Sequence, residues 1–216
     1  MGFALSGFMP IAELITAFAT LFVVIDPIGL MPLFVALTAG MTPAQRRAIA
    51  LRSCIVAAGL LTLFGLLGDA VLDFIGISMP AFRIAGGILL FLTALDMLFE
   101  RRTARRKGQA EDDGPGEDPS VFPLAMPLIA GPGAMATMIL LAGAPETSWT
   151  DSLAIHLVML AVIAVVFAFF LAAGLLERAL GPTGINVITR LLGMLLAALS
   201  VQFVIDGIRA TGLTPL

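Results

Sequence analysis

Long apolar segments dominate the chain, and short polar turns separate them. The six apolar segments are residues 11–37, 48–74, 82–99, 121–141, 153–176 and 185–208. Each has about 18 to 27 residues, and a helix rising about 1.5 Å per residue needs about 20 to cross a bilayer core. A soluble bundle would need polar faces at helical spacing, which a segment such as 153–176 lacks. The pattern therefore predicts an all-α polytopic membrane protein with six transmembrane helices.

Composition supports this prediction and excludes several classes of protein. Of 216 residues, 59% are hydrophobic and 12% are charged, whereas a soluble domain is about half apolar and about a quarter charged. The 12 Lys and Arg and 15 Asp and Glu make 27 charges, and 11 of these lie between Glu100 and Asp118. So few charges elsewhere exclude a nucleic-acid-binding protein, a secreted disulfide scaffold and an ordinary cytosolic enzyme. The lone Cys54 is interpreted as a packing residue.

The basic residues predict how the chain is oriented in the membrane. The first ten residues are uncharged, unlike a cleavable signal peptide, so the first helix is expected to stay in the protein. Lysine and arginine in short loops remain on the cytoplasmic side. They follow the first, third and fifth spans, as Arg46, Arg47, Arg52, Arg101, Arg102, Arg105, Arg106, Lys107, Arg178 and Arg190. This predicts a bacterial inner-membrane protein with both termini on the periplasmic side.

Residues 100–120 form a charged segment, basic and then acidic, that predicts a cytoplasmic linker between two halves, residues 1–99 and 121–216. The halves correspond: Arg83 and Arg190 each begin an Arg-x-x-Gly motif, and ten residues later stand Thr93 and Ser200. Because three spans are an odd number, two such halves cross the membrane in opposite directions. This is the inverted-repeat plan of many secondary transporters, whose substrate sites lie where paired helices are interrupted.

Proline and glycine predict that the first helix of each half is broken. The first span holds Pro27, Gly29 and Pro32, and the fourth holds Pro123, Pro127, Gly131, Pro132 and Gly133. A half-helix starting after the second break would aim free amides and a positive dipole end at an anionic group. The structural alternative is that these prolines only kink the two helices without forming a site, since proline and glycine are common in membrane helices.

Asp26 is the leading candidate for a functional residue, because it lies in the first break near mid-membrane depth, where an ionisable group is costly. It would accept a substrate ammonium, a sodium ion or a proton. The predicted substrate- or ion-binding residues are Asp26, Pro27, Gly29, Ala130, Gly131, Pro132, Gly133 and Thr137. Candidate gates or charge partners are Arg83, Arg190, Thr93, Ser200 and Gln202. For the two arginines the alternative is that their long side chains only extend to the lipid headgroups. His156 is expected to be a hydrogen-bonded interfacial residue rather than a proton relay.

Four motifs in order resemble the MarC family: residues 26–34, 76–87, 123–133 and 184–193, the last followed by Val-Gln-Phe at 201–203. These six-span bacterial and archaeal inner-membrane proteins are also called the neutral amino acid transporter family and are grouped with the LysE-type exporters. The resemblance implies transport of small neutral amino acids such as glycine or alanine. Because family members can carry asparagine at the position of Asp26, it implies hydrogen bonding or cation coordination there rather than an obligatory proton carrier.

The sequence thus predicts a secondary transporter with a midplane site between the two broken helices and a zwitterionic amino acid as substrate. No cofactor, metal or nucleic acid is expected; the partners are the substrate and the bilayer. Coupling to sodium or protons, the direction of transport and homo-oligomerisation stay open. The alternatives are a non-transporting membrane scaffold or accessory protein, or an exporter of another small metabolite. An intramembrane enzyme is disfavoured, because no paired nucleophile and base and no histidine-rich metal motif is visible.

Overall fold

A computed structural model describes residues 9–99, 118–143 and 147–212, and every regular element in these ranges is a helix. In chain order they are α1 (Ile11–Ile25), α2 (Pro27–Leu37), α3 (Pro43–Ile75), α4 (Met79–Leu98), η1 (Ser120–Ile129), α6 (Pro132–Ala142) and α7 (Trp149–Ala210). Within the described ranges, five helices are long and apolar enough to cross a membrane, or up to six if η1 and α6 form one bent span. The predicted all-α architecture with several membrane-crossing helices is confirmed.

Local capping signals explain where the long helices begin and end. Thr42 and Gln45 form a capping box before α3, in which the side chain of each accepts a hydrogen bond from the backbone amide of the other. Ser78 caps α4 and Ser148 caps α7 through their hydroxyl oxygens, which accept hydrogen bonds from the backbone amides of Ala81 and Asp151. Gly76 ends α3 in the left-handed conformation (φ 83°), which favours glycine.

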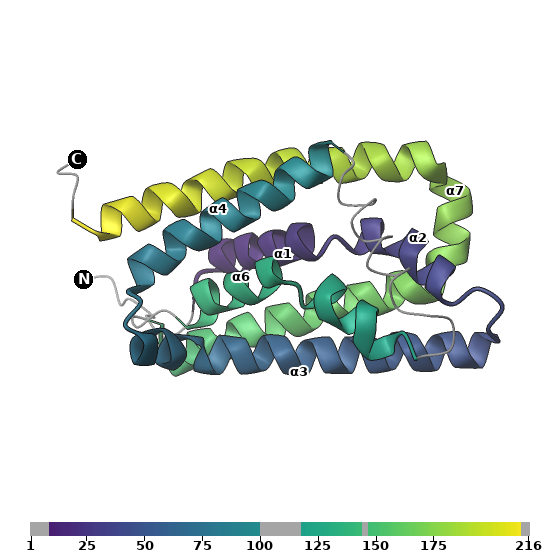
Figure 1. Ribbon diagram of the computed structural model, residues 1–216, viewed down its shortest axis with the longest axis horizontal. Coiled ribbons are helices and arrows are strands. Elements are labelled where there is room, and N and C mark those ends of the chain that lie inside the picture. Colours follow the sequence, from purple (N-terminus) through teal and green to yellow (C-terminus); the bar gives the residue numbers. More distant parts are fainter. Residues whose placement is uncertain (1–8, 100–117, 144–146, 213–216) are drawn as a thin grey trace, which may run out of the picture.

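The interrupted helices lie inside the bundle and the continuous helices surround them (Figure 1). In the most apolar window of Ile11–Leu37, 61% of the residues are buried, against 22 to 33% for the four continuous spans. In Figure 1, α3 and the first part of α7 lie on one side of α1 and α6, and α4 with the last part of α7 lies on the other. Phe34 of α2 stacks on Phe170 of α7 with ring centroids 4.3 Å apart.

Successive spans of the chain run through the bundle in alternating directions (Figure 1). The 62-residue α7 turns across one end of the molecule at Gly181 (φ 63°) and Pro182, so that its two parts serve as separate spans. Spans in corresponding positions run in opposite directions in Figure 1. A symmetry relation between the halves, with residues 1–99 and 121–216 as repeats, stays a prediction.

Close backbone approaches hold α4 against the last part of α7. A Cβ on Gly87 would lie 2.8 Å from the carbonyl oxygen of Ser200, and one on Gly207 would lie 3.1 Å from the carbonyl oxygen of Pro80. Glycine is required at both positions because a side chain would separate the helices. The glycines of the two Arg-x-x-Gly motifs also lie in close packing: a Cβ on Gly86 would lie 3.1 Å from Leu140 Cδ1, and one on Gly193 would lie 2.9 Å from Met97 Cβ.

The predicted cytoplasmic linker lies outside the described residues except for residues 118–120. Asp118 forms an ion pair with Arg52 of α3 and accepts a hydrogen bond from the amide of Ser120 at 3.0 Å. Both side chains of the ion pair are exposed, so it contributes little to stability. It places the start of η1 beside α3.

The predicted orientation of the chain in the membrane can be tested by labelling cysteines placed at the two ends of the bundle. The start of α1 and the end of α7 share one end, and the α2–α3 turn lies at the other (Figure 1). In a Cys54→Ala background, Ala210→Cys is expected to react with an impermeant thiol reagent in intact cells, because positive loops stay inside. Ala39→Cys, exposed in the α2–α3 turn, is expected to react only after permeabilisation. The reverse labelling pattern would overturn the orientation.

Candidate substrate site at the two helix breaks

Asp26 joins α1 to α2 and is buried, with 1% of the residue exposed. It has φ 58° and ψ 66°, and it is the only non-glycine residue with positive φ in the described part of the chain. Its amide donates to the carbonyl oxygen of Phe22 at 2.9 Å, which closes α1. Its carboxylate accepts from the amide of Gly29 at 3.0 Å, which opens α2. One residue therefore ends one helix and starts the next.

These two tasks explain the residue types in the first break. The left-handed conformation is tolerated by Gly, Asn and Asp, and a helix N-cap needs a side-chain oxygen. Only Asp and Asn satisfy both requirements well. Position 29 needs glycine because a Cβ there would overlap the Asp26 carboxylate. Pro27 occupies the first helical position of α2, where no amide donor is needed.

The second break lies between η1 and α6, whose axes differ by 58°. Within η1 the backbone is extended at Phe122 and Met126, each followed by a cis proline. Gly131 caps α6 without any side-chain hydrogen bond. A Cβ on Gly131 would lie 2.6 Å from the carbonyl oxygen of Pro127, so glycine is needed there for space rather than for its φ of −74°.

The two breaks are neighbours inside the bundle. A Cβ on Gly133, in the first turn of α6, would lie 3.4 Å from Val24 Cγ1 of α1 and 3.3 Å from Leu90 Cδ2 of α4. Val24 stands two residues before Asp26, so the start of α6 packs beside the last turn of α1. Ala130, just before the start of α6, is 0% exposed, whereas Gly131 is half-buried and Pro132 is exposed. The start of α6 therefore packs against α1 and α4 on one face and is accessible on another.

Two of the predicted hydroxyl residues lie at this junction. Thr137 is fully buried in α6, where its hydroxyl donates to the carbonyl oxygen of Gly133 at 2.8 Å. Thr93 Oγ1 is 3.9 Å from the position of a Cβ on Gly133, and it donates to the carbonyl oxygen of Leu89 at 3.0 Å. Each hydroxyl donates its hydrogen bond to a carbonyl oxygen of its own helix, and each lies close to Gly133 at the start of α6.

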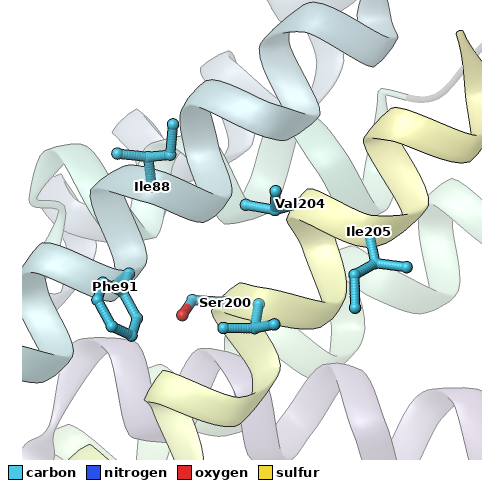
Figure 2. A pocket seen from close by; sticks show the side chains of 6 residues that line it. Ile88, Phe91, Ser200, Val204 and Ile205 are labelled. Atoms are coloured by element: carbon cyan, nitrogen blue, oxygen red, sulfur yellow. The ribbon is translucent and has the colours of Figure 1, made fainter. Parts of the chain in front are cut away.

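The remaining predicted gate residues lie elsewhere. Arg83, in the second turn of α4, and the exposed Arg190 lie toward opposite ends of the α4–α7 pair, because Ile84 contacts Gly207 whereas Met97 contacts Gly193. The exposed Gln202 donates to Asp206 at 2.9 Å. Ser200 donates to the carbonyl oxygen of Ala197 at 2.7 Å. It lines a hollow of about 220 Å³ between α4 and α7, with Phe91 and Val204 among its neighbours (Figure 2).

His156 makes a hydrogen bond, as expected, between its Nδ1 and the carbonyl oxygen of Ser152. Its depth at the membrane interface stays a prediction, but the sequence does not show that only 8% of it is exposed or that it packs against Gly65 of α3 and near Met138 of α6. A lone histidine in an apolar segment does not reveal which neighbour faces it. The glycine at position 65 on another span was the only available signal, and pairing the two requires the fold.

The fold and the interior helix breaks define a polytopic helical membrane protein. The chain matches the family described as MarC family integral membrane protein over residues 11–211, and it belongs to that family. It is 36% identical over 198 residues to a UPF0056 membrane protein of Aquifex aeolicus, covering 90% of this chain and 92% of the relative. It is 34% identical over 199 residues to the UPF0056 inner membrane protein YhgN of Escherichia coli K12, covering 91% and 96%.

A third relative is similar over nearly its whole length. The UPF0056 membrane protein MJ1677 of Methanocaldococcus jannaschii is 34% identical over 203 residues, covering 93% of this chain and 98% of the relative. No solved structure matches the chain. The predicted family is confirmed by these similarities.

Proposed function

We propose that this protein is an inner-membrane secondary transporter of small neutral amino acids such as glycine and alanine, working by alternating access between the two broken spans. The observation that carries the proposal is the start of α6, which has no side-chain cap and packs beside the last turn of α1. The first amides of a helix without a side-chain cap need other partners, and a bound substrate can supply them.

The start of α6 suits a carboxylate. Pro132 has no amide hydrogen, so the amides of Gly133 and Ala134 are the donors that the first turn directs toward a ligand. Their partial positive charge adds to the positive end of the helix dipole, which attracts anions. Gly131 and Gly133 leave the backbone accessible at the position where a carboxylate would contact it.

The first break suits the opposite charge. At the start of α2 the anion is supplied by the chain, because the Asp26 carboxylate caps the helix. At the start of α6 the chain supplies no side-chain oxygen. A zwitterion placed between them would present its carboxylate to α6 and its ammonium toward Asp26, or a coupling cation would take the latter position. This difference between two otherwise similar breaks favours an amino acid over a simple anion.

The surrounding side chains favour a small substrate. Val24, Leu90, Ala130 and Ala134 are buried and apolar, and Leu90 lies 3.3 Å from the position of a Cβ on Gly133. An amino acid with a hydrogen or methyl side chain fits such tightly packed surroundings better than a long or charged one. Location in a bacterial inner membrane is supported by the relative YhgN, an inner membrane protein, and periplasmic termini are supported by the positions of the basic residues.

Ligand analogues test the pairing of charges at this site. Alanine is expected to raise the thermal midpoint of the purified protein, because a ligand that binds only the native state stabilises it, by about 2.7 kcal/mol at 100 times Kd. Alaninamide lacks the carboxylate and propionate lacks the ammonium, so neither is expected to stabilise the protein at the same concentration. Equal stabilisation by propionate would show that the ammonium is not recognised and would contradict the proposal.

A further inference from the structure

His156 carries the one unpartnered titratable atom among the buried side chains of the described residues. Its Nδ1 lies 2.7 Å from the carbonyl oxygen of Ser152. Because a carbonyl oxygen only accepts, Nδ1 holds the ring hydrogen and Nε2 keeps its lone pair. Nε2 is buried and has no hydrogen-bond partner in the described part of the chain. The other two such atoms, Ser120 Oγ and Thr189 Oγ1, belong to hydroxyls, which do not bind protons near neutral pH.

Three helices meet at Nε2. A Cβ on Gly65 of α3 would lie 2.8 Å from Nε2 and 3.0 Å from the Met138 methyl of α6. Glycine at position 65 therefore makes room for the imidazole ring. The ring is enclosed between α3, α6 and its own helix α7, near the end of the bundle where α7 begins.

The charged residues around this point are few. On α3, Asp69 lies one turn beyond Gly65 on the same face, and the exposed Asp73 follows one turn later. On α7, Asp151 accepts a hydrogen bond from the Ser148 hydroxyl at 2.6 Å. Helix α6 contains no charged residue. Nε2 itself lies beside Gly65 and near the methyl group of Met138, and it forms no hydrogen bond with any described residue.

We infer that His156 Nε2 binds the coupling proton of the transporter, taking it from water when α3 and α7 separate at this end and releasing it when they pack together. In the packed arrangement an added N–H would have no acceptor, and an unpaired buried donor is costly. In the separated arrangement water accepts from it. Proton binding therefore favours the state open at this end.

This inference rests on the proposed transport function, and the experiment separates the two. Protein in liposomes is given labelled alanine in two assays, with potassium and valinomycin holding the membrane potential at zero. Counterflow at equal pH on both sides reports exchange alone. Accumulation driven by a pH gradient, imposed in either direction, reports coupling. If one proton moves with each substrate molecule, a gradient of about one pH unit supports about tenfold accumulation of alanine. The pH gradient and the tenfold concentration ratio each correspond to about 1.4 kcal/mol.

The wild-type protein is expected to show both activities, and His156→Gln is expected to retain counterflow while losing pH-driven accumulation. Gly65→Ala, whose methyl would press on the imidazole, is expected to reduce accumulation in the same way. Gly59→Ala on the same helix has nothing within 4 Å of the new Cβ and is expected to behave like the wild type.

The outcomes that would overturn the inference are distinct. Absence of counterflow in the wild type refutes the proposed transport function. Counterflow without pH-driven accumulation in the wild type, or full accumulation by His156→Gln, refutes the proton site alone. Loss of counterflow in both His156→Gln and His156→Asn also refutes it, because a coupling site is not needed for exchange at equal pH.

Discussion

Replacing Asp26 by alanine is expected to abolish transport and to lower the free energy of unfolding by about 2 to 3 kcal/mol. Alanine loses the hydrogen bond to the amide of Gly29, which costs about 1 kcal/mol as a lost N-cap. It must also adopt φ 58°, which costs an L-residue with a Cβ about 1 to 2 kcal/mol. Thermal unfolding in detergent measures the stability term, and uptake of labelled alanine into liposomes measures the functional term.

Two further variants separate the conformational role of Asp26 from its charge. Asp26→Gly keeps the left-handed conformation, and Asp26→Asn keeps both the conformation and the cap, so both are expected to unfold close to the wild-type midpoint. If the carboxylate charge meets the substrate ammonium or a cation, Asp26→Asn is expected to transport more slowly while remaining stable. Asp26→Ala that folds and transports at the wild-type rate would refute a role for this residue.

Gly131→Ala is expected to be the most damaging conservative change in the second half of the chain. The added methyl would lie 2.6 Å from the carbonyl oxygen of Pro127, and a backbone atom cannot move aside as a side chain does. Overpacking of this kind costs about 1 to 3 kcal/mol. Because the shift displaces the start of α6, binding of alanine by the purified protein is expected to fall about tenfold or more, which corresponds to about 1.4 kcal/mol.

A graded series provides the control for this prediction. Gly133→Ala meets only the side chains of Leu90 and Val24, at 3.3 and 3.4 Å, so its effect on stability is expected to be smaller. Gly174→Ala meets nothing within 4 Å and is expected to leave both stability and binding unchanged. Binding by Gly131→Ala equal to that of Gly174→Ala would contradict the placement of the substrate at the start of α6.

The sequence predicts the helices well because the requirement to span a bilayer acts on each segment separately. An apolar run of the right length specifies a membrane helix whatever packs against it. Local chemistry also indicates where helices start and stop, as in the Thr42 and Gln45 box before α3. The positions of Asp26 and Gly131 at interruptions follow from the conformational limits of proline, glycine and aspartate, which are likewise local.

What depends on the pairing of distant segments is not predictable in the same way. Thr93 and Ser200 occupy matching places in the two halves, yet Thr93 faces the start of α6 while Ser200 packs against Gly87. Their different surroundings arise from how α4 and α7 rotate against their neighbours. The position of His156 near the start of its span is visible in the sequence, whereas the glycine that accommodates its ring lies on α3 and is found only from the fold.

Counterflow of labelled alanine in liposomes tests the central claim most directly. Vesicles loaded with unlabelled alanine and containing the wild-type protein are expected to take up labelled alanine transiently above equilibrium, whereas empty vesicles and vesicles with Asp26→Ala are not. The overshoot requires exchange through a site that opens to one side at a time. Uptake by the wild-type protein equal to that of empty vesicles, with glycine as well as alanine, would contradict the proposed transport of small neutral amino acids.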